Sequence, residues 1–381
     1  MKRPLLSIAS LALLPAPLLA LAACGGGTDE AGAPPPLSEG ALDAVVADPG
    51  APREDLARRI DRLFIGQGMG ETRAVLVMHN GQTVAERYAP GYGEETRFIS
   101  WSMAKTITGV MIGMLVADGK LQLDETPPIP NWRRTGDPRG EITLRQLLQM
   151  RSGLRHTEST EPAQEADTVK MLFLQGRDDM AAWAEAQPLE AKPGSRFEYS
   201  TNTTVILADI AARVLTDSAD PEMRRKAVDE YLKARIFVPL GMYSMVPEYD
   251  RAGTLIGGSL IHGTARDWAR FGEFLRHEGA VKGAQLVPKS WISFMITPSP
   301  RSPDYGAQIW LNRPSGTDRN VLFADRGPAD LFSMVGHLGQ YVMVSPSQGL
   351  TVVRLGKTDD TIRDPLVAAL GDVVALFPIR K

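Results

Sequence analysis

The sequence predicts an α+β fold, in which one antiparallel sheet is built from both ends of the chain, is flanked by helices, and receives a mainly helical insert at about residues 120–300. Apolar residues recur at helical spacing through the middle of the chain. Short runs rich in β-branched and aromatic residues lie on both sides of that middle part. These runs are residues 74–79, 82–88, 307–312, 331–335, 340–344 and 350–355.

Residues 1–24 have the features of a bacterial targeting segment. Lys2 and Arg3 precede an apolar run that ends in Leu-Ala-Ala-Cys24. Cys24 is the only cysteine, so an intrachain disulfide is impossible. The placement of Cys24 resembles the lipobox of lipoproteins and implies lipidation there, although an ordinary secretory signal with an incidental cysteine is the alternative. Because Gly25 and not an aspartate follows, the resemblance implies export and a lipid anchor in the outer membrane, facing the periplasm.

The next segment, residues 25–53, is rich in glycine, alanine, proline and acidic residues, which is typical of a flexible tether. We therefore expect residues 54–381 to form one large folded domain.

Composition excludes several kinds of partner. The formal net charge is −3, and the chain has neither a basic cluster nor a glycine-rich phosphate loop, which argues against nucleic acid and nucleotides. The five histidines are scattered and no His-Glu-x-x-His occurs, so we expect no metal and no cofactor. We expect a monomer that acts on a small molecule.

The elements can be justified in chain order. Residues 54–65 place apolar side chains on one side of a helix, and Asn80-Gly81 joins two strand-like runs as in a type I′ hairpin. Thr143 and Gln146 form a capping box that opens a short helix to Met150. Further helices are predicted over residues 165–187, 202–216, 221–236, 263–278, 288–296 and 365–377.

The first candidate site lies at the start of a buried helix. Ser102 precedes an apolar run, Thr106 to Ala117, which continues without proline to a helix-ending Gly119. Residues three apart share a helix face, so the Lys105 ammonium can reach the Ser102 hydroxyl, and the free N–H groups of the first turn point to the same place. A nucleophile, a base and oxyanion donors are thus available for acyl transfer. A capping serine and a solvated lysine would give the same spacing, but Lys105 has apolar neighbours.

Two downstream segments carry side chains that could support this pair. Tyr199 lies on a turn directly before a predicted helix. His337 lies at the entrance of a late strand, where the Gly339 peptide could approach a substrate closely.

These groups, in this order, resemble the motifs of the serine β-lactamase and penicillin-recognising superfamily, in its class C branch. Within that branch the resemblance is to esterases and 6-aminohexanoate-dimer hydrolases, and it covers about residues 55–378. It implies a β-lactamase/transpeptidase-like fold, an acylated Ser102 with Lys105 as its partner, and Tyr199 as the phenol that shuttles the proton. It also implies an oxyanion hole made by the backbone N–H groups of Ser102 and Gln340.

Two departures from the family pattern affect the expected substrate. The family motif Tyr-x-Asn has Thr201 in its third position here, so either Thr201 or Asn202 supplies the polar contact, unless Asn202 only caps the helix. His337 stands where the family usually has a lysine, and a mostly neutral imidazole binds a carboxylate less well than an ammonium.

We therefore expect a serine hydrolase for ester or amide substrates, small molecules or peptides. The alternatives are a β-lactamase or a D-amino-acid-specific peptidase of the same fold, and a lipoprotein that only binds cell-wall fragments. Whether Lys105 or Tyr199 is the base stays open, as does the role of His337. An α/β-hydrolase is excluded because no Gly-x-Ser-x-Gly occurs.

Overall fold

The computed structural model describes residues 36–380, and the folded unit begins at Leu37. A six-stranded antiparallel sheet of order β2-β1-β11-β10-β9-β8 joins the two ends of the chain, as the sequence predicts. The two long strands β1 and β11 pair from Glu71↔Lys357 to His79↔Leu350, with a shift of register between Thr72 and Ala74. The sheet strands are β1 Glu71–His79, β2 Gln82–Tyr88, β8 Trp310–Leu311, β9 Phe332–Gly336, β10 Gln340–Ser345 and β11 Leu350–Lys357.

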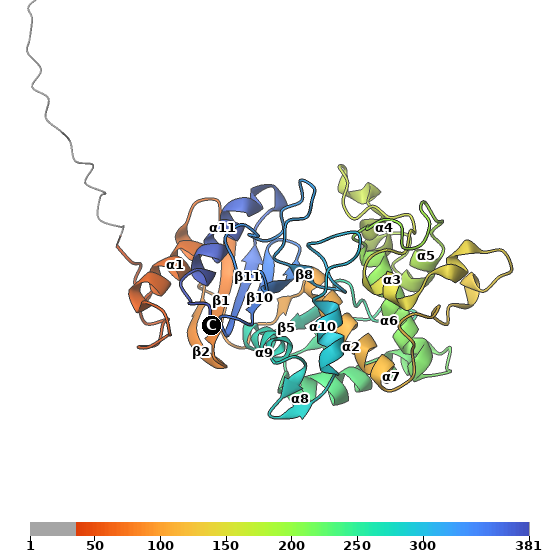
Figure 1. Cartoon of the computed structure of the whole chain (residues 1–381), viewed down its shortest axis with the longest axis horizontal. Helices are drawn as coiled ribbons and strands as arrows, with labels where there is room; N and C mark the ends of the chain where they lie inside the picture. Colours follow the sequence, from red (N-terminus) through yellow and green to blue (C-terminus); the bar gives the residue numbers. More distant parts are fainter. Residues whose placement is uncertain (1–35, 381) are drawn as a thin grey trace, which may run out of the picture. The chain divides into compact units, whose positions relative to one another are not determined.

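Helices cover both faces of this sheet (Figure 1). In β1, Ala74 and Leu76 belong to the core that α9 shares, whereas Val75 and Val77 belong to the core under α1 and α11. Successive strand residues point to opposite faces, so a strand that is covered on both sides becomes apolar at nearly every position. This explains the continuous run at residues 74–77. The three helices are α1 Arg53–Ile65, α9 Ala265–Arg276 and α11 Arg363–Val374.

The helical region is built around α2, which is buried along almost its whole length. The predicted capping box of α3 is present, with Thr143 and Gln146 each bonding the other's backbone N–H. The single helix expected over residues 165–187 is two helices, because Asp179 caps a new helix after a tight turn at Gly176. The helices are α2 Ala104–Ala117, α3 Leu144–Leu148, α4 Asp167–Phe173, α5 Met180–Glu185, α6 Thr201–Leu215, α7 Pro221–Leu232, α8 Val238–Leu240 and α10 Lys289–Met295.

Two small sheets complete the fold. One has the order β3-β5-β4 and brings the segment before Ser102 against a distant part of the chain, with Phe98 opposite Gly263 and Ile99 opposite His262. The strands are β3 Phe98–Ile99, β4 Val246–Pro247, β5 Ile261–Gly263, β6 Ala280–Val281 and β7 Ala284–Gln285.

The segment expected to be the end of the tether packs on the domain. Ala41 and Val45 are buried, and Val45 forms a bridge with Ala85 of β2. Ser38 bonds Asp61 of α1 through its backbone N–H, at 2.9 Å, and through its hydroxyl. The folded unit therefore begins before residue 54, where the sequence placed its start. Composition alone does not show that Ala41 and Val45 are buried against the domain. Residues 1–35, with Cys24, lie outside the described part.

Candidate active site

Ser102 lies in a 3₁₀ turn, Trp101–Met103, that leads directly into α2. Trp101 has φ of +45°, a conformation that is strained for a bulky side chain. The preceding residue, Ser100, fixes the turn: its N–H donates to the Ile261 carbonyl at 3.0 Å, and its hydroxyl donates to the Ser259 carbonyl at 3.1 Å. The strained turn is thus held by contacts with the small sheet, and Ser102 stands at the mouth of a cavity.

Lys105 is 1% exposed and points back to Ser102 from the first turn of α2. Its Nζ lies 3.1 Å from Ser102 Oγ, 2.7 Å from Thr201 Oγ1 and 2.8 Å from the Gly258 carbonyl oxygen. Burial lowers the pKa of Lys105 to about 8, although the negative charge of Glu158 opposes this shift. At pH 7 roughly a tenth of this amine is therefore neutral, far more than for an ordinary lysine.

Glu158 links this lysine to a wider polar network. Its Oε1 accepts from Thr201 Oγ1 at 2.5 Å, and its Oε2 accepts from Thr201 N–H at 2.8 Å, His156 Nε2 at 2.7 Å and Thr168 Oγ1 at 3.0 Å. Burial alone would raise the pKa of Glu158, but the hydrogen bond from His156 and the charge of Lys105 outweigh it and hold this pKa at about 2. Glu158 is therefore an anion, and because an anion only accepts, His156 carries its proton on Nε2.

Tyr199 faces Ser102 and Lys105 from the turn before α6. Its ring stacks on Trp310, with centroids 5.1 Å apart, and Lys105 Nζ lies 5.0 Å from the ring centre. Burial raises the pKa of the Tyr199 phenol well above its usual value, the charge of Glu158 raises it further, and an interaction with Ser102 opposes both. The phenol is thus neutral over the physiological pH range.

The cavity in front of Ser102 has a volume of about 530 Å³. The side chains that α4 contributes to the cavity are mostly apolar, whereas other parts of the lining carry charge. Arg319, one of the charged lining residues, is neutralised by Asp304, with bonds of 2.6 and 2.8 Å. Arg363 donates to the Asn320 carbonyl at 2.8 Å, its Nε is buried without a hydrogen-bond partner, and no ion pair links it to an acid within residues 36–380. Other lining residues include Trp101, Ala163, Ala166, Val169, Leu172, Phe173, Val335, Gly336 and Asp360.

The structure does not bring all of the late-strand residues to the cavity. His337 lines the rim, with its Nδ1 2.9 Å from Asp360 Oδ2, and this contact raises the pKa of His337. Gly339 lies on the other side of the hairpin, where its carbonyl accepts from Arg354 and an added Cβ would meet Arg354 at 2.7 Å. The Gln340 side chain is buried and bonds the backbone of its own hairpin, such as the His337 carbonyl at 3.0 Å. Neither Gly339 nor Gln340 lines the cavity.

A close approach between two backbone segments occurs at Gly336. A Cβ on Gly336 would lie 2.3 Å from the Ser100 carbonyl oxygen. The last residue of β9 must therefore be glycine, because this strand runs beside the turn that carries Ser102. Gly339 needs to be glycine for a different reason, since its φ is +78° and its Cβ would meet Arg354.

Of the two candidates after Tyr199, Thr201 makes the polar contact with Lys105. Asn202 is buried, both of its amide atoms lack a partner among residues 36–380, and it does not line the cavity. It is not the helix cap either, because the Ser200 hydroxyl accepts from Thr203 N–H. Sequence reasoning missed Glu158. The signal that could have found it is its spacing of two from His156, because side chains two residues apart in an extended segment point to the same side of the backbone.

Comparison with known proteins identifies the family to which the chain belongs. The family model described as Beta-lactamase matches residues 62–376. The chain belongs to the Beta-lactamase family. A 6-aminohexanoate-dimer hydrolase of Paenarthrobacter ureafaciens is 24% identical over 336 residues, which cover 82% of this chain and 81% of that protein.

Solved structures share the same fold. A family VIII carboxylesterase aligns with a TM-score of 0.62 and 16% identity, over 84% of this chain and 96% of that one. A β-lactamase from Mycobacterium bovis aligns with a TM-score of 0.57 and 19% identity, over 83% and 99%. The protein is thus a hydrolase with the serine β-lactamase fold.

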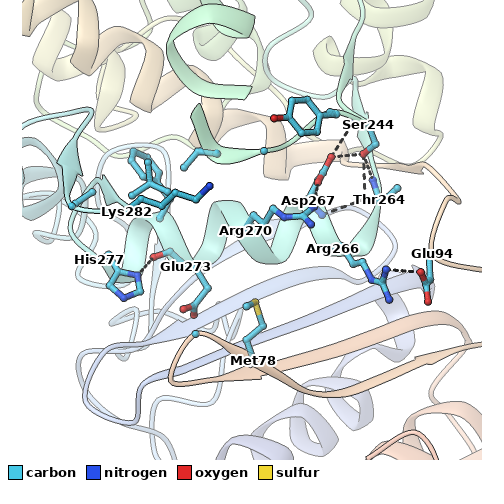
Figure 2. A pocket seen from close by; sticks show the side chains of 18 of the residues that line it. Met78, Glu94, Ser244, Thr264, Arg266, Asp267, Arg270, Glu273, His277 and Lys282 are labelled. Atoms are coloured by element: carbon cyan, nitrogen blue, oxygen red, sulfur yellow. Dashed lines mark hydrogen bonds and ion pairs between the residues drawn. The ribbon is translucent and has the colours of Figure 1, made fainter. Parts of the chain in front are cut away.

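A second cavity, of about 930 Å³, lies beside α9, away from the family's site (Figure 2). Its arginines are paired, Arg266 with Glu94 and Arg270 with Asp267. The serine that lines it, Ser244, donates its hydroxyl to Asp267 at 2.6 Å. No lysine or histidine bonds this serine among the described residues, so the cavity has no activated nucleophile.

Residues 36–380 contain no cluster of His, Cys, Asp and Glu side chains suited to a metal ion. Within the same residues, every helix is too short or too polar to span a bilayer.

Proposed function

We propose that this protein hydrolyses esters or amides through an acyl-enzyme on Ser102, with Lys105 as the general base. The observation that carries the proposal is a fully buried amine, with its pKa lowered to about 8, at 3.1 Å from a cavity-lining hydroxyl. In acylation the Ser102 oxygen bonds the substrate carbonyl carbon as its proton moves to Lys105 Nζ. The leaving group then departs with a proton, and water releases the acid.

Hydrogen-bond counting supports Lys105 over Tyr199 as the base. A neutral amine has two N–H groups and one lone pair. The Gly258 carbonyl can only accept, and Thr201 Oγ1 accepts from Lys105 because its own proton is given to Glu158. Both N–H groups are thus engaged, and the remaining lone pair faces Ser102 Oγ.

Tyr199 suits the second proton transfer better than the first. Its raised pKa makes the phenolate rare, so it is a poor base at neutral pH. A neutral phenol beside Ser102 can instead donate a proton to the departing group and regain one from Lys105. We propose this role for Tyr199, and we propose the backbone N–H groups of Ser102 and His337 as oxyanion donors, since both residues line the cavity.

The cavity suits a substrate with an apolar acyl part. The α4 side chains would contact that part, and the relatives described above include a carboxylesterase and a hydrolase of an amide dimer. His337 is already paired with Asp360, which weakens it as a carboxylate ligand. Arg363 favours the second candidate, a carboxylate-bearing substrate such as a β-lactam or a peptide, because it has no acidic partner among the described residues.

Intact-mass spectrometry with short p-nitrophenyl esters tests the proposal. We expect wild type to gain the mass of the acyl group and to release p-nitrophenol, and Ser102→Ala to do neither. Ser102 makes no helix-capping bond, so the variant should keep the stability of wild type within about 1 kcal/mol. An adduct of equal yield on Ser102→Ala would move the nucleophile elsewhere.

We also propose that the protein is exported and held at a bacterial membrane by a lipid on Cys24. Only the sequence supports this, through the small residues before a single cysteine.

A further inference from the structure

We propose that Glu158 is a positioning residue that directs the lone pair of Lys105 toward Ser102, through the Thr201 hydroxyl, and sets the pH at which that lone pair becomes available. This inference rests on the proposed role of Lys105 as the base. The observation behind it is an unbroken chain of polar contacts, from Ser102 Oγ to Lys105 Nζ at 3.1 Å, to Thr201 Oγ1 at 2.7 Å, and to Glu158 Oε1 at 2.5 Å.

The direction of this chain depends on the charge at its end. A hydroxyl has one proton to donate, and a carboxylate has none. Thr201 must therefore give its proton to Glu158, which leaves Thr201 Oγ1 as an acceptor for Lys105. If Glu158 were a donor, Thr201 could turn its proton toward Lys105 and engage the lone pair, and Ser102 would lose its base.

Glu158 itself is held in one orientation. Three donors converge on its Oε2: the Thr201 N–H, His156 Nε2 and Thr168 Oγ1. The His156 side chain is 1% exposed, so it cannot move without disturbing the core. Oε1 consequently points to the Thr201 hydroxyl. The Thr201 oxygen thus lies between the Glu158 carboxylate and the Lys105 amine.

Glu158 is also the charged group that acts on Lys105. Burial and Glu158 are the two causes of the altered proton affinity of this lysine, and Glu158 favours the ammonium. Tyr199, whose ring faces Lys105, is neutral at physiological pH. Tyr305 is buried beside Tyr199, and His156 and His337 are each paired with a carboxylate, His337 with Asp360. Two arginines also line the cavity: Arg319, which pairs with Asp304, and Arg363, which donates to the Asn320 carbonyl.

A Glu158→Gln variant tests both roles of Glu158, the direction of the Lys105 lone pair and the pH at which Lys105 loses its proton. The amide oxygen is expected at the position of Oε2, where three donors meet, which places the amide NH₂ against Thr201 Oγ1 and reverses the chain. We expect the plateau of kcat/KM to fall by about 10-fold to 100-fold, as for a misdirected general base. We also expect the acid limb of the pH profile to move down by about one pH unit, because a nearby opposite charge has been removed.

The matched control is Glu165→Gln. Glu165 lies in the same segment but is exposed and pairs with Lys170 at 2.9 Å, so the control removes a charge without touching the chain of contacts. Its acid limb should coincide with that of wild type. An acid limb that is unmoved in Glu158→Gln, or that moves equally in the two variants, would overturn the inference.

A second pair of variants tests the relay if Glu158→Gln folds poorly. Thr201→Val has the same shape without a hydroxyl and should lose about 10-fold or more of the plateau, whereas Thr201→Ser keeps a hydroxyl and should lose clearly less. Equal plateaus for these two would contradict the proposed relay.

The ionisation can be followed without turnover. The ¹³Cε resonance of Lys105, assigned through Lys105→Arg, should titrate about one pH unit lower in Glu158→Gln than in wild type. This measurement separates the two proposals: absence of an acyl adduct would defeat the proposed function, whereas equal Lys105 titrations would defeat the role of Glu158.

Discussion

Replacing Lys105 by methionine should change the pH dependence of stability by an amount that the structure specifies. Burial lowers the pKa of Lys105 from 10.5 to about 8. Between these values the unfolded chain holds a proton that the folded chain has lost, so the free energy of unfolding rises with pH across this window. A shift of about 2.5 pKa units corresponds to ~3 kcal/mol. Below pH 8 the folded protein therefore carries the full penalty of a buried ammonium, and above pH 10.5 it carries none.

Methionine has a similar length and no charge, so Lys105→Met removes this contribution. It also leaves the Gly258 carbonyl without its donor, which costs about 1–3 kcal/mol at every pH. The constant cost cancels when two pH values are compared. Urea unfolding at pH 7.5 and 10.5 should show that the stability of the variant relative to wild type falls by ~3 kcal/mol at the higher pH.

Lys170→Met is the matched control, because Lys170 is partly exposed and its pair with Glu165 lies at the surface. Its stability relative to wild type should change little between the two pH values. If Lys105→Met behaved like this control, Lys105 would not be a buried lysine with a lowered pKa, and the argument for it as the base would lose its physical ground.

Three further predictions follow from other parts of the chain. Gly336→Ala should lower the free energy of unfolding in urea by about 1–3 kcal/mol, because its Cβ would meet the Ser100 carbonyl at 2.3 Å; an unchanged midpoint would mean that β9 and the nucleophile turn move apart easily. Arg363→Gln should reduce kcat/KM for a p-nitrophenyl ester with a free carboxylate about 5-fold relative to a neutral ester, which corresponds to ~1 kcal/mol; an unchanged ratio would show that Arg363 does not contact the carboxylate. Cys24→Ser should release the protein from membrane fractions, and a variant that stays membrane-bound and fully processed would contradict lipid anchoring.

The fold could be predicted from the sequence where local patterns coincide with tertiary contacts. The Asn80-Gly81 hairpin, the capping box at Thr143 and the helix that follows Ser102 were all predicted, and in each the decisive groups lie within a few residues of one another. The β-branched and aromatic runs at both ends of the chain were enough to predict the shared sheet, because strands at both ends with helices between them imply one antiparallel sheet.

The site was less predictable, because its geometry depends on distant segments. Glu158 meets Thr201 across 43 residues, and no local pattern marks that contact. The close approach at Gly336 has a similar origin, because its backbone lies against Ser100, more than 230 residues earlier, and no local pattern reports that contact. The helical segment at residues 165–187 was misjudged because Gly176 packs against Trp183, a contact that local propensity does not report.

The pairing of β1 with β11 has a consequence for how the chain acquires its structure. The first long strand finds its central partner about 280 residues later, so β1 emerges from the ribosome with both of its faces apolar and one edge unpaired. Contacts of such sequence separation slow folding, since a long loop must close before any of them forms. A chain that ends before Leu350 would lack the middle of its sheet rather than a border strand, and should be degraded or aggregate rather than fold in part. The segment that begins at Leu350 thus determines when the rest of the protein can become native.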